Sequence, residues 1–117
     1  MAPEDVVGEA FCYLTTRGRR TGRPHEIEIW FAVAGGTFYL MSGGGDAADW
    51  VRNLRAEPTV TLRVGQTVWT GRGRVVAGDG EAAQARRLVF DKYQPGYGGS
   101  LTGWRDTALP VAVDVQS

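Results

Sequence analysis

The sequence contains very little of several residue types on which whole classes of protein depend. It has one cysteine, Cys12, which excludes an internal disulfide and a multi-cysteine metal site. It has one histidine, His25, and a lone histidine cannot hold zinc without carboxylate partners, so no metal site is expected. The formal net charge is zero, which argues against nucleic-acid binding, because such binding normally draws on the field of a basic domain. No run approaches the roughly 18 apolar residues of a membrane span, so stable membrane insertion is not expected.

The common catalytic and nucleotide-binding signatures are missing as well. No G-x-G-x-x-G follows a predicted strand, and no G-x-x-x-x-G-K-[ST] occurs. No G-x-S-x-G elbow is present, and a serine triad would have to use His25. Glu26 and Glu28 share a strand face and could act as an acid–base pair, but a solvated face that balances nearby arginines is the simpler interpretation. Residues 1–8 lack the basic start and apolar segment of a signal peptide, so we expect a cytoplasmic protein.

Arginine is concentrated in one short stretch, Arg17-Gly18-Arg19-Arg20-Thr21-Gly22-Arg23-Pro24-His25. The stretch lies between two predicted strands, so we expect a hairpin turn. A turn of arginines and glycines presents guanidinium groups and backbone N–H groups together, and that combination suits a phosphate or a carboxylate. The alternative is a solvated loop tip that keeps a small barrel soluble.

A second glycine-rich segment, Ser42-Gly43-Gly44-Gly45-Asp46, ends a predicted strand and leads into a predicted helix. Asp46 is the expected N-cap of that helix. The glycines leave backbone N–H groups free near the positive end of the helix. Because Asp46 is itself negative, we expect a polar heterocycle or a carbonyl group at the glycines and the phosphate at the arginine turn. A simple flexible turn is the alternative.

Hydrophobic alternation and turn residues predict the fold. At 117 residues the chain is expected to form one domain, with residues 1–9 as a loose N-terminal segment. Strands are predicted at residues 11–16, 25–33, 37–41, 59–64, 67–76 and 109–115. One helix is predicted to begin after Asp46 and to end before Pro58, and another is predicted over residues 79–93.

Most of the predicted links between strands are too short for the crossovers of a parallel sheet. The sequence therefore predicts a mainly β (α+β) fold, a six-stranded antiparallel barrel with two flanking helices. Within 25–33, Phe31 is expected on the same face as Ile27 and Ile29, with Trp30 on the other face. Gly71 and Gly73 predict a bulge or a sharp bend, as barrel closure requires.

Several segments in order resemble one known family. The run Leu14-Thr15-Thr16-Arg17-Gly18-Arg19-Arg20-Thr21-Gly22-Arg23-Pro24 resembles the opening signature of the deazaflavin-dependent nitroreductases, roughly L-T-T-x-G-R-[KR]-[ST]-G-x-P-R. The similarity continues through residues 42–45, 50–54, 57–60 and 104–110, and it covers residues 14 to 115. Members of that family are small split β-barrels related to the pyridoxamine-phosphate-oxidase-like flavin-binding group. The resemblance implies such a barrel, with reduced 5-deazaflavin coenzyme F420 as its cofactor.

The coenzyme carries a phosphate and an oligoglutamate tail, and the resemblance assigns roles by position. Four residues of the hairpin would hold phosphate and tail: Arg19, Arg20, Arg23 and His25. Three residues would line the deazaflavin ring through backbone groups: Ser42, Gly43 and Gly44. Two residues of the following helix would close the pocket: Trp50 and Asn53. The candidate catalytic residues, on the substrate side, are Ser42 and Tyr97.

The expected function is therefore that of a deazaflavin-dependent reductase. The cofactor would give hydride to an electron-poor small molecule, such as an activated C=C, a quinone or a nitro compound. Parts of the superfamily hold fatty acids instead, so a carrier of an apolar or amphipathic ligand stays open, as does an FMN- or haem-binding split barrel. A homodimer is a further alternative that the sequence leaves open.

Overall fold

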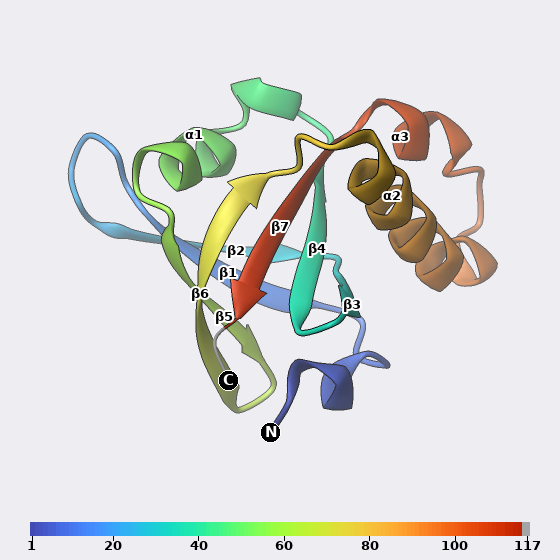
Figure 1. The fold of residues 1–117 in the computed structure, drawn as a ribbon, viewed down its shortest axis with the longest axis horizontal. Coiled ribbons are helices and arrows are strands. Elements are labelled where there is room, and N and C mark those ends of the chain that lie inside the picture. Colours follow the sequence, from blue (N-terminus) through green and yellow to red (C-terminus); the bar gives the residue numbers. More distant parts are fainter. Residues whose placement is uncertain (116–117) are drawn as a thin grey trace.

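The computed structural model describes residues 1–115, which form one curled antiparallel sheet with helices around it (Figure 1). The strands are β1 (Cys12–Arg17), β2 (Pro24–Ile29), β3 (Ala32–Ala34), β4 (Thr37–Ser42), β5 (Thr59–Val64), β6 (Thr67–Val75) and β7 (Leu109–Val115). The α-helices are α1 (Asp49–Ala56), α2 (Asp79–Tyr93) and α3 (Thr102–Thr107). Short 3₁₀ helices are η1 (Pro3–Val6), η2 (Gly45–Ala47) and η3 (Gln94–Gly96).

The strand order explains the curl of the sheet. The order is β2-β1-β5-β6-β7-β4-β3, and every neighbouring pair is antiparallel. The strands β2 and β3 stand at opposite ends of this order, yet only Trp30 and Phe31 separate them in the chain. Two residues cannot span a flat sheet of seven strands, so the sheet must bend until its ends approach. This confirms the predicted mainly β split barrel.

The sheet has seven strands rather than the predicted six, because the predicted strand over 25–33 is broken at Phe31. The backbone of Phe31 bonds to helix α2 and not to a strand: its N–H donates to Tyr93 Oη at 3.0 Å, and its carbonyl accepts from Lys92 Nζ at 2.9 Å. The Phe31 side chain is fully buried, whereas Ile27 and Ile29 are only half-buried. The prediction of one continuous strand was therefore wrong, but the predicted face is confirmed, because Ile27, Ile29 and Phe31 all pack into the main core.

The helices match the sequence prediction only in part. The helix over 79–93 is confirmed as α2. The prediction of Asp46 as N-cap was wrong, because α1 begins at Asp49 with Ala48 in the capping position. Asp46 lies in η2, and its carboxylate accepts from Nη2 of Arg55 at 2.6 Å. The short helix α3 was not predicted, so residues 1–115 contain three α-helices in place of two.

The main core fills the inside of the curl. Three aromatic rings run through it, with Phe38 5.4 Å from Phe31 and 5.3 Å from Trp69 between ring centroids. Alternate residues of β5 point inward as predicted, namely Val60, Leu62 and Val64. A second apolar cluster lies between the sheet and α2: Ala32, Tyr39, Met41, Val76, Ala85, Val89, Ala108 and Ala112.

The two glycines of β6 allow close packing rather than a bulge. On the β7 side, strand pairing stays in register past both of them, and on the β5 side it stays in register past Gly71 and ends at Arg72. A Cβ on Gly71 would lie 2.7 Å from Cγ1 of Val113, and a Cβ on Gly73 would lie 2.4 Å from Cδ1 of Leu54. Gly71 therefore lets β7 pair closely with β6, and Gly73 lets α1 lie against the sheet. Of the two predicted features, the bulge was wrong, and the sharp bend stays a prediction.

Residues 1–9, expected to be loose, are tied to the barrel. Val6 is buried in the main core, and Oε1 of Glu4 accepts from the N–H of Gly36 at 2.7 Å. The indole N–H of Trp69 donates to the carbonyl of Met1 at 3.0 Å. Among the described residues, no helix has the length and apolar content required to span a bilayer.

Candidate functional site

The arginine-rich segment is the turn between β1 and β2. Inside the turn, the N–H of Gly18 donates to the carbonyl of Arg23 and the N–H of Gly22 donates to the carbonyl of Gly18, both at 2.8 Å. Gly22 has a φ of 73°, a left-handed conformation that favours glycine. Nη1 of Arg17 also donates to the Gly22 carbonyl at 2.8 Å. The turn is thus internally bonded, while Arg20 and Arg23 in it are exposed.

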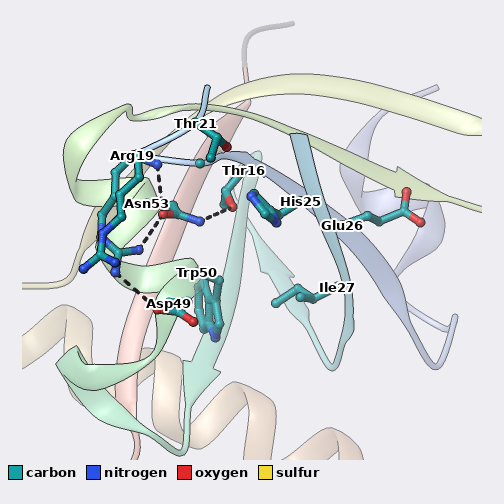
Figure 2. Close-up of a pocket in the computed structure, with 11 residues that line it drawn as sticks. Thr16, Arg19, Thr21, His25, Glu26, Ile27, Asp49, Trp50 and Asn53 are labelled. Carbon is teal, nitrogen blue, oxygen red and sulfur yellow. Dashed lines mark hydrogen bonds and ion pairs between the residues drawn. The ribbon is translucent and has the colours of Figure 1, made fainter. Parts of the chain in front are cut away.

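A cavity of about 480 Å³ lies between this turn, β2 and α1 (Figure 2). Its volume is within the range of small-molecule sites in proteins. Two segments distant in the sequence, the β1–β2 hairpin and α1, line it: Thr16, Gly18, Arg19, Arg20, Thr21, His25, Glu26, Ile27, Asp49, Trp50 and Asn53. Trp50 and Ile27 supply apolar surface, and Arg19, Arg20 and His25 supply cationic or hydrogen-bonding groups.

Asn53 fixes the position of Arg19. Oδ1 of Asn53 accepts from Nη1 of Arg19 at 2.7 Å and from its backbone N–H at 3.2 Å. Nδ2 of Asn53 donates to Oγ1 of Thr16 at 3.5 Å, a long hydrogen bond between two buried residues. Because a single amide oxygen holds both the backbone and the guanidinium of Arg19, α1 sets where this charge points.

Two carboxylates border the cavity, and only one faces the arginines. Oδ1 of Asp49 lies 3.3 Å from Nη2 of Arg19. Figure 2 shows the Glu26 carboxylate directed away from Arg19, and Oε2 of Glu26 lies 3.8 Å from Nη2 of Arg63. His25 lies against the turn, where a Cβ on Gly18 would come within 2.7 Å of its Nε2. The missing side chain at position 18 therefore leaves room for the imidazole.

The structure brings together five of the predicted coenzyme-binding residues at this cavity: Arg19, Arg20, His25, Trp50 and Asn53. Arg23 is an exposed residue of the same turn and is not among the lining residues. The predicted ring-binding segment at the end of β4 is also outside the lining. There, Oγ of Ser42 is buried and donates to the carbonyl of Gly45 at 3.0 Å. Gly43 and Gly44 are exposed.

Tyr97 belongs to an aromatic cluster that the sequence did not reveal. The Trp30 ring stacks on Tyr93, with centroids 4.2 Å apart and planes 3° apart. Tyr97 and Trp104 meet the same indole edge-on, at 6.0 Å and 5.8 Å. A Cβ on Gly43 would lie 3.5 Å from Nε1 of Trp104, so the glycine run borders this cluster. Tyr97 is 47 % exposed, so the cluster reaches the surface.

Sequence reasoning missed the cluster because its members come from the β2–β3 link, α2, the loop after η3, and α3. Trp30 was expected on the opposite face of a continuous strand from Phe31. That expectation is confirmed, because Phe31 packs into the main core while Trp30 stacks on Tyr93 of α2. The alternation was thus the one available signal, and it did not reveal which distant rings Trp30 would meet.

Comparison with known proteins decides the family. Residues 4–116 match the model of the F420H(2)-dependent quinone reductase family, which is almost the whole chain. The chain belongs to this family. The resemblance to deazaflavin-dependent reductases, inferred from the sequence motifs, is thereby confirmed.

Several solved structures share the fold of this family member. An F420-H2-dependent reductase, FDR-A, is 21% identical with a TM-score of 0.71, covering 92% of this chain and 95% of that one. A conserved hypothetical protein from Mycobacterium tuberculosis is 21% identical with a TM-score of 0.76, covering 100% and 82%. An FAD-binding protein from Mesorhizobium loti is 14% identical with a TM-score of 0.70, covering 97% and 84%. The fold is thus the split barrel of the pyridoxamine-phosphate-oxidase-like proteins.

Titratable groups of this family member pack behind the aromatic cluster. Burial lowers the pKa of Lys92 to about 8, and its Nζ lies 3.7 Å from the centre of the Phe31 ring. Burial raises the pKa of Tyr93 to about 12, so its hydroxyl keeps its proton at neutral pH. That hydroxyl lies 2.7 Å from the carbonyl of Ala10. These groups hold the cluster against the barrel.

This arrangement offers groups that could bind a ligand. Burial raises the pKa of Cys12 to about 12, which keeps the thiol protonated and unreactive. Within residues 1–115, no three His, Cys, Asp or Glu side chains gather as a metal site would need. The cavity offers fixed donors for an anion, and the aromatic cluster offers flat apolar surface.

Proposed function

We propose that this protein is an oxidoreductase that binds reduced coenzyme F420 and reduces an electron-poor small molecule, such as a quinone, an activated C=C or a nitro compound. The family name indicates F420 dependence. The single observation that carries the proposal is the guanidinium of Arg19, which Asn53 holds at the cavity beside Arg20 and His25.

The donor groups at the cavity fit the acidic part of the coenzyme. A guanidinium has five N–H donors, and Arg19 commits Nη1 to Asn53 and Nη2 to Asp49, which leaves further donors for a ligand. Arg20 is exposed and has no hydrogen-bond or ion-pair partner among the described residues. We assign the phosphate and the first tail carboxylates to Arg19, Arg20 and His25, and the outer tail to Arg23.

The ring is assigned to the glycine run, which leads from β4 toward α1 and borders the aromatic cluster. Exposed Gly43 and Gly44 present the backbone without side chains, and Gly43 lies beside Trp104. When bound, the coenzyme supplies the hydride. Trp30 and Trp104 would offer stacking surface to a flat acceptor, and Tyr97 would donate a hydrogen bond or a proton to it. Ser42 would hold the glycine run in place through its bond to Gly45, and it would orient the acceptor if that bond opens.

The test is a fluorescence titration of the purified protein with F420 and with FMN, side by side. Charge-assisted hydrogen bonds are worth roughly 1.5–3 kcal/mol each, so Arg19→Ala with Arg20→Ala should weaken F420 binding about 100-fold or more. The matched control is Arg72→Ala with Arg87→Ala, which removes the same charge from exposed positions outside the cavity. Equal losses in both double variants, or no F420 binding by the wild type, would reject the proposal.

The aromatic cluster favours a second candidate, a carrier of an amphipathic ligand such as a fatty acid. Its carboxylate would pair with the same arginines, while its chain would cover Trp30 and Trp104. A fatty acid that binds more tightly than F420, together with no reduction of any acceptor by the F420-loaded protein, would favour the carrier.

A further inference from the structure

We propose that Asp49 sets the anion selectivity of the cavity, because its carboxylate competes with the ligand for the guanidinium of Arg19. The inference rests on the proposed function, since it concerns how the same cavity accepts an acidic ligand. Asp49 is the first residue of α1, one turn before Asn53, so both residues reach the hairpin from the same helix.

The two contacts of α1 with Arg19 differ in strength. Asn53 is 5% exposed, and its Oδ1 lies 2.7 Å from Nη1 of Arg19. Asp49 approaches Nη2 at 3.3 Å, and its side chain is 85% exposed against 23% for Arg19. A hydrogen bond to a buried amide persists, whereas an ion pair with one partner in water is weak and easily exchanged. A ligand anion can therefore displace Asp49 from Arg19 without disturbing Asn53.

The charges around Arg19 leave Asp49 as the one carboxylate that opposes an anion there, among the lining residues of the described chain. Arg20 and His25 line the same cavity. Glu26 also lines it, but its carboxylate pairs with Arg63 and points away (Figure 2). An anion at Nη2 must share the space with the displaced Asp49 carboxylate. Each added negative charge on the ligand raises this repulsion, so Asp49 disfavours highly charged anions most.

The test compares Asp49→Asn with Asp46→Asn. Both variants remove one negative charge near the start of α1, but Asp46 pairs with Arg55 at 2.6 Å and lies outside the cavity. One unit charge at about 4 Å in water changes affinity about fivefold. Asp49→Asn should therefore bind inorganic pyrophosphate at least fivefold more tightly by calorimetry, whereas Asp46→Asn should stay within about twofold of the wild type. The gain should shrink at high salt, because screening weakens exposed charges.

The outcomes separate this inference from the proposed function. Weaker pyrophosphate binding by Asp49→Asn would make Asp49 a positioning group for Arg19 and overturn the proposal. The proposal would also be overturned if Asp49→Asn and the wild type bound pyrophosphate with equal affinity, or if neither bound it detectably. F420 is titrated in parallel: if the wild type binds F420 and Asp49→Asn binds it no more tightly, the selectivity role is wrong and the proposed function stands. If neither protein binds F420 while Asp49→Asn gains pyrophosphate affinity, the proposed function fails and the role of Asp49 stands.

Discussion

Adding one methyl group at Gly73 should damage both the stability and the ligand cavity. The Cβ of Gly73→Ala would lie 2.4 Å from Cδ1 and 2.5 Å from Cγ of Leu54, a residue that is 1% exposed. The Gly73 N–H also donates to the carbonyl of Pro58 at 2.8 Å, which ties β6 to the segment after α1. The strand cannot retreat without losing that bond, so α1 must move instead.

The magnitude follows from core packing. Overfilling a packed core costs roughly 1–3 kcal/mol, and the cost is highest where neighbours cannot shift. Truncating a buried leucine costs roughly 2–5 kcal/mol. In the double variant, the methyl group added at position 73 would occupy part of the space that Leu54→Ala leaves. The double variant should therefore unfold at nearly the same urea concentration as Leu54→Ala alone.

Urea denaturation of wild type, both single variants and the double variant gives the coupling free energy. We expect the double variant to be more stable than additivity predicts by about 1–3 kcal/mol, as for residues in direct contact. The control is Gly80→Ala, because Gly80 is exposed in α2 and its added Cβ would meet no atom within 4 Å beyond the backbone of its own helix and its chain neighbours. Helix propensity should make that control equally or slightly more stable. Additive costs, or a cost for Gly73→Ala below about 0.5 kcal/mol, would refute the reasoning.

Three further predictions concern titratable and aromatic side chains. Burial lowers the pKa of Lys92 from 10.5 to about 8, so between about pH 8 and 10 this group makes stability rise with pH, whereas burial raises the pKa of Cys12 from 9.0 to about 12 and opposes that rise above about pH 9. The contribution of Lys92, measured in urea titrations as the difference between the wild type and Lys92→Met, should be about 1 kcal/mol after allowing for solvent screening of a half-buried group. Above pH 10 stability should fall, because burial raises the pKa of Cys12, Tyr39 and Tyr93 to about 12 and the folded state keeps their protons; a rise that continues there would contradict this account. The buried Cys12 thiol, with its pKa raised to about 12, should react with iodoacetamide only in urea, and mass spectrometry that finds labelling of the native protein would show that the site opens. Tyr97→Phe should lower the turnover with a quinone by about 10-fold to 100-fold while F420 affinity changes less than twofold, and unchanged turnover would remove Tyr97 from the reaction.

Local features of the sequence were predicted well. The alternation of Val60, Leu62 and Val64 and the apolar run over 109–115 identified β5 and β7, because strand periodicity depends only on which face is buried. The arginine hairpin was also predictable, since glycines and a proline mark the turn and its partner strands are neighbours in sequence. Of the candidate site, the hairpin and the helix that carries Asn53 followed from the motifs.

Features that depend on distant contacts were not predictable. The break at Phe31 is set by Tyr93 and Lys92, more than sixty residues away. The aromatic cluster around Trp30 depends on the packing of α2 and α3, because Tyr93 and Trp104 are more than sixty positions from Trp30. The role of Asn53 as the residue that holds Arg19 also needs the fold, because the two side chains are 34 positions apart.

By itself, the sequence determined which segments form most of the strands of the barrel, where the arginine-rich turn lies, and the family to which the chain belongs. These rest on local spacing, which survives without knowledge of distant neighbours. Only the tertiary structure decided which arginine is fixed, which carboxylate opposes it, and which aromatic rings meet. Those outcomes depend on how far the sheet curls and on how closely α1 packs over Gly73, and both are settled by excluded volume between segments that the sequence keeps apart.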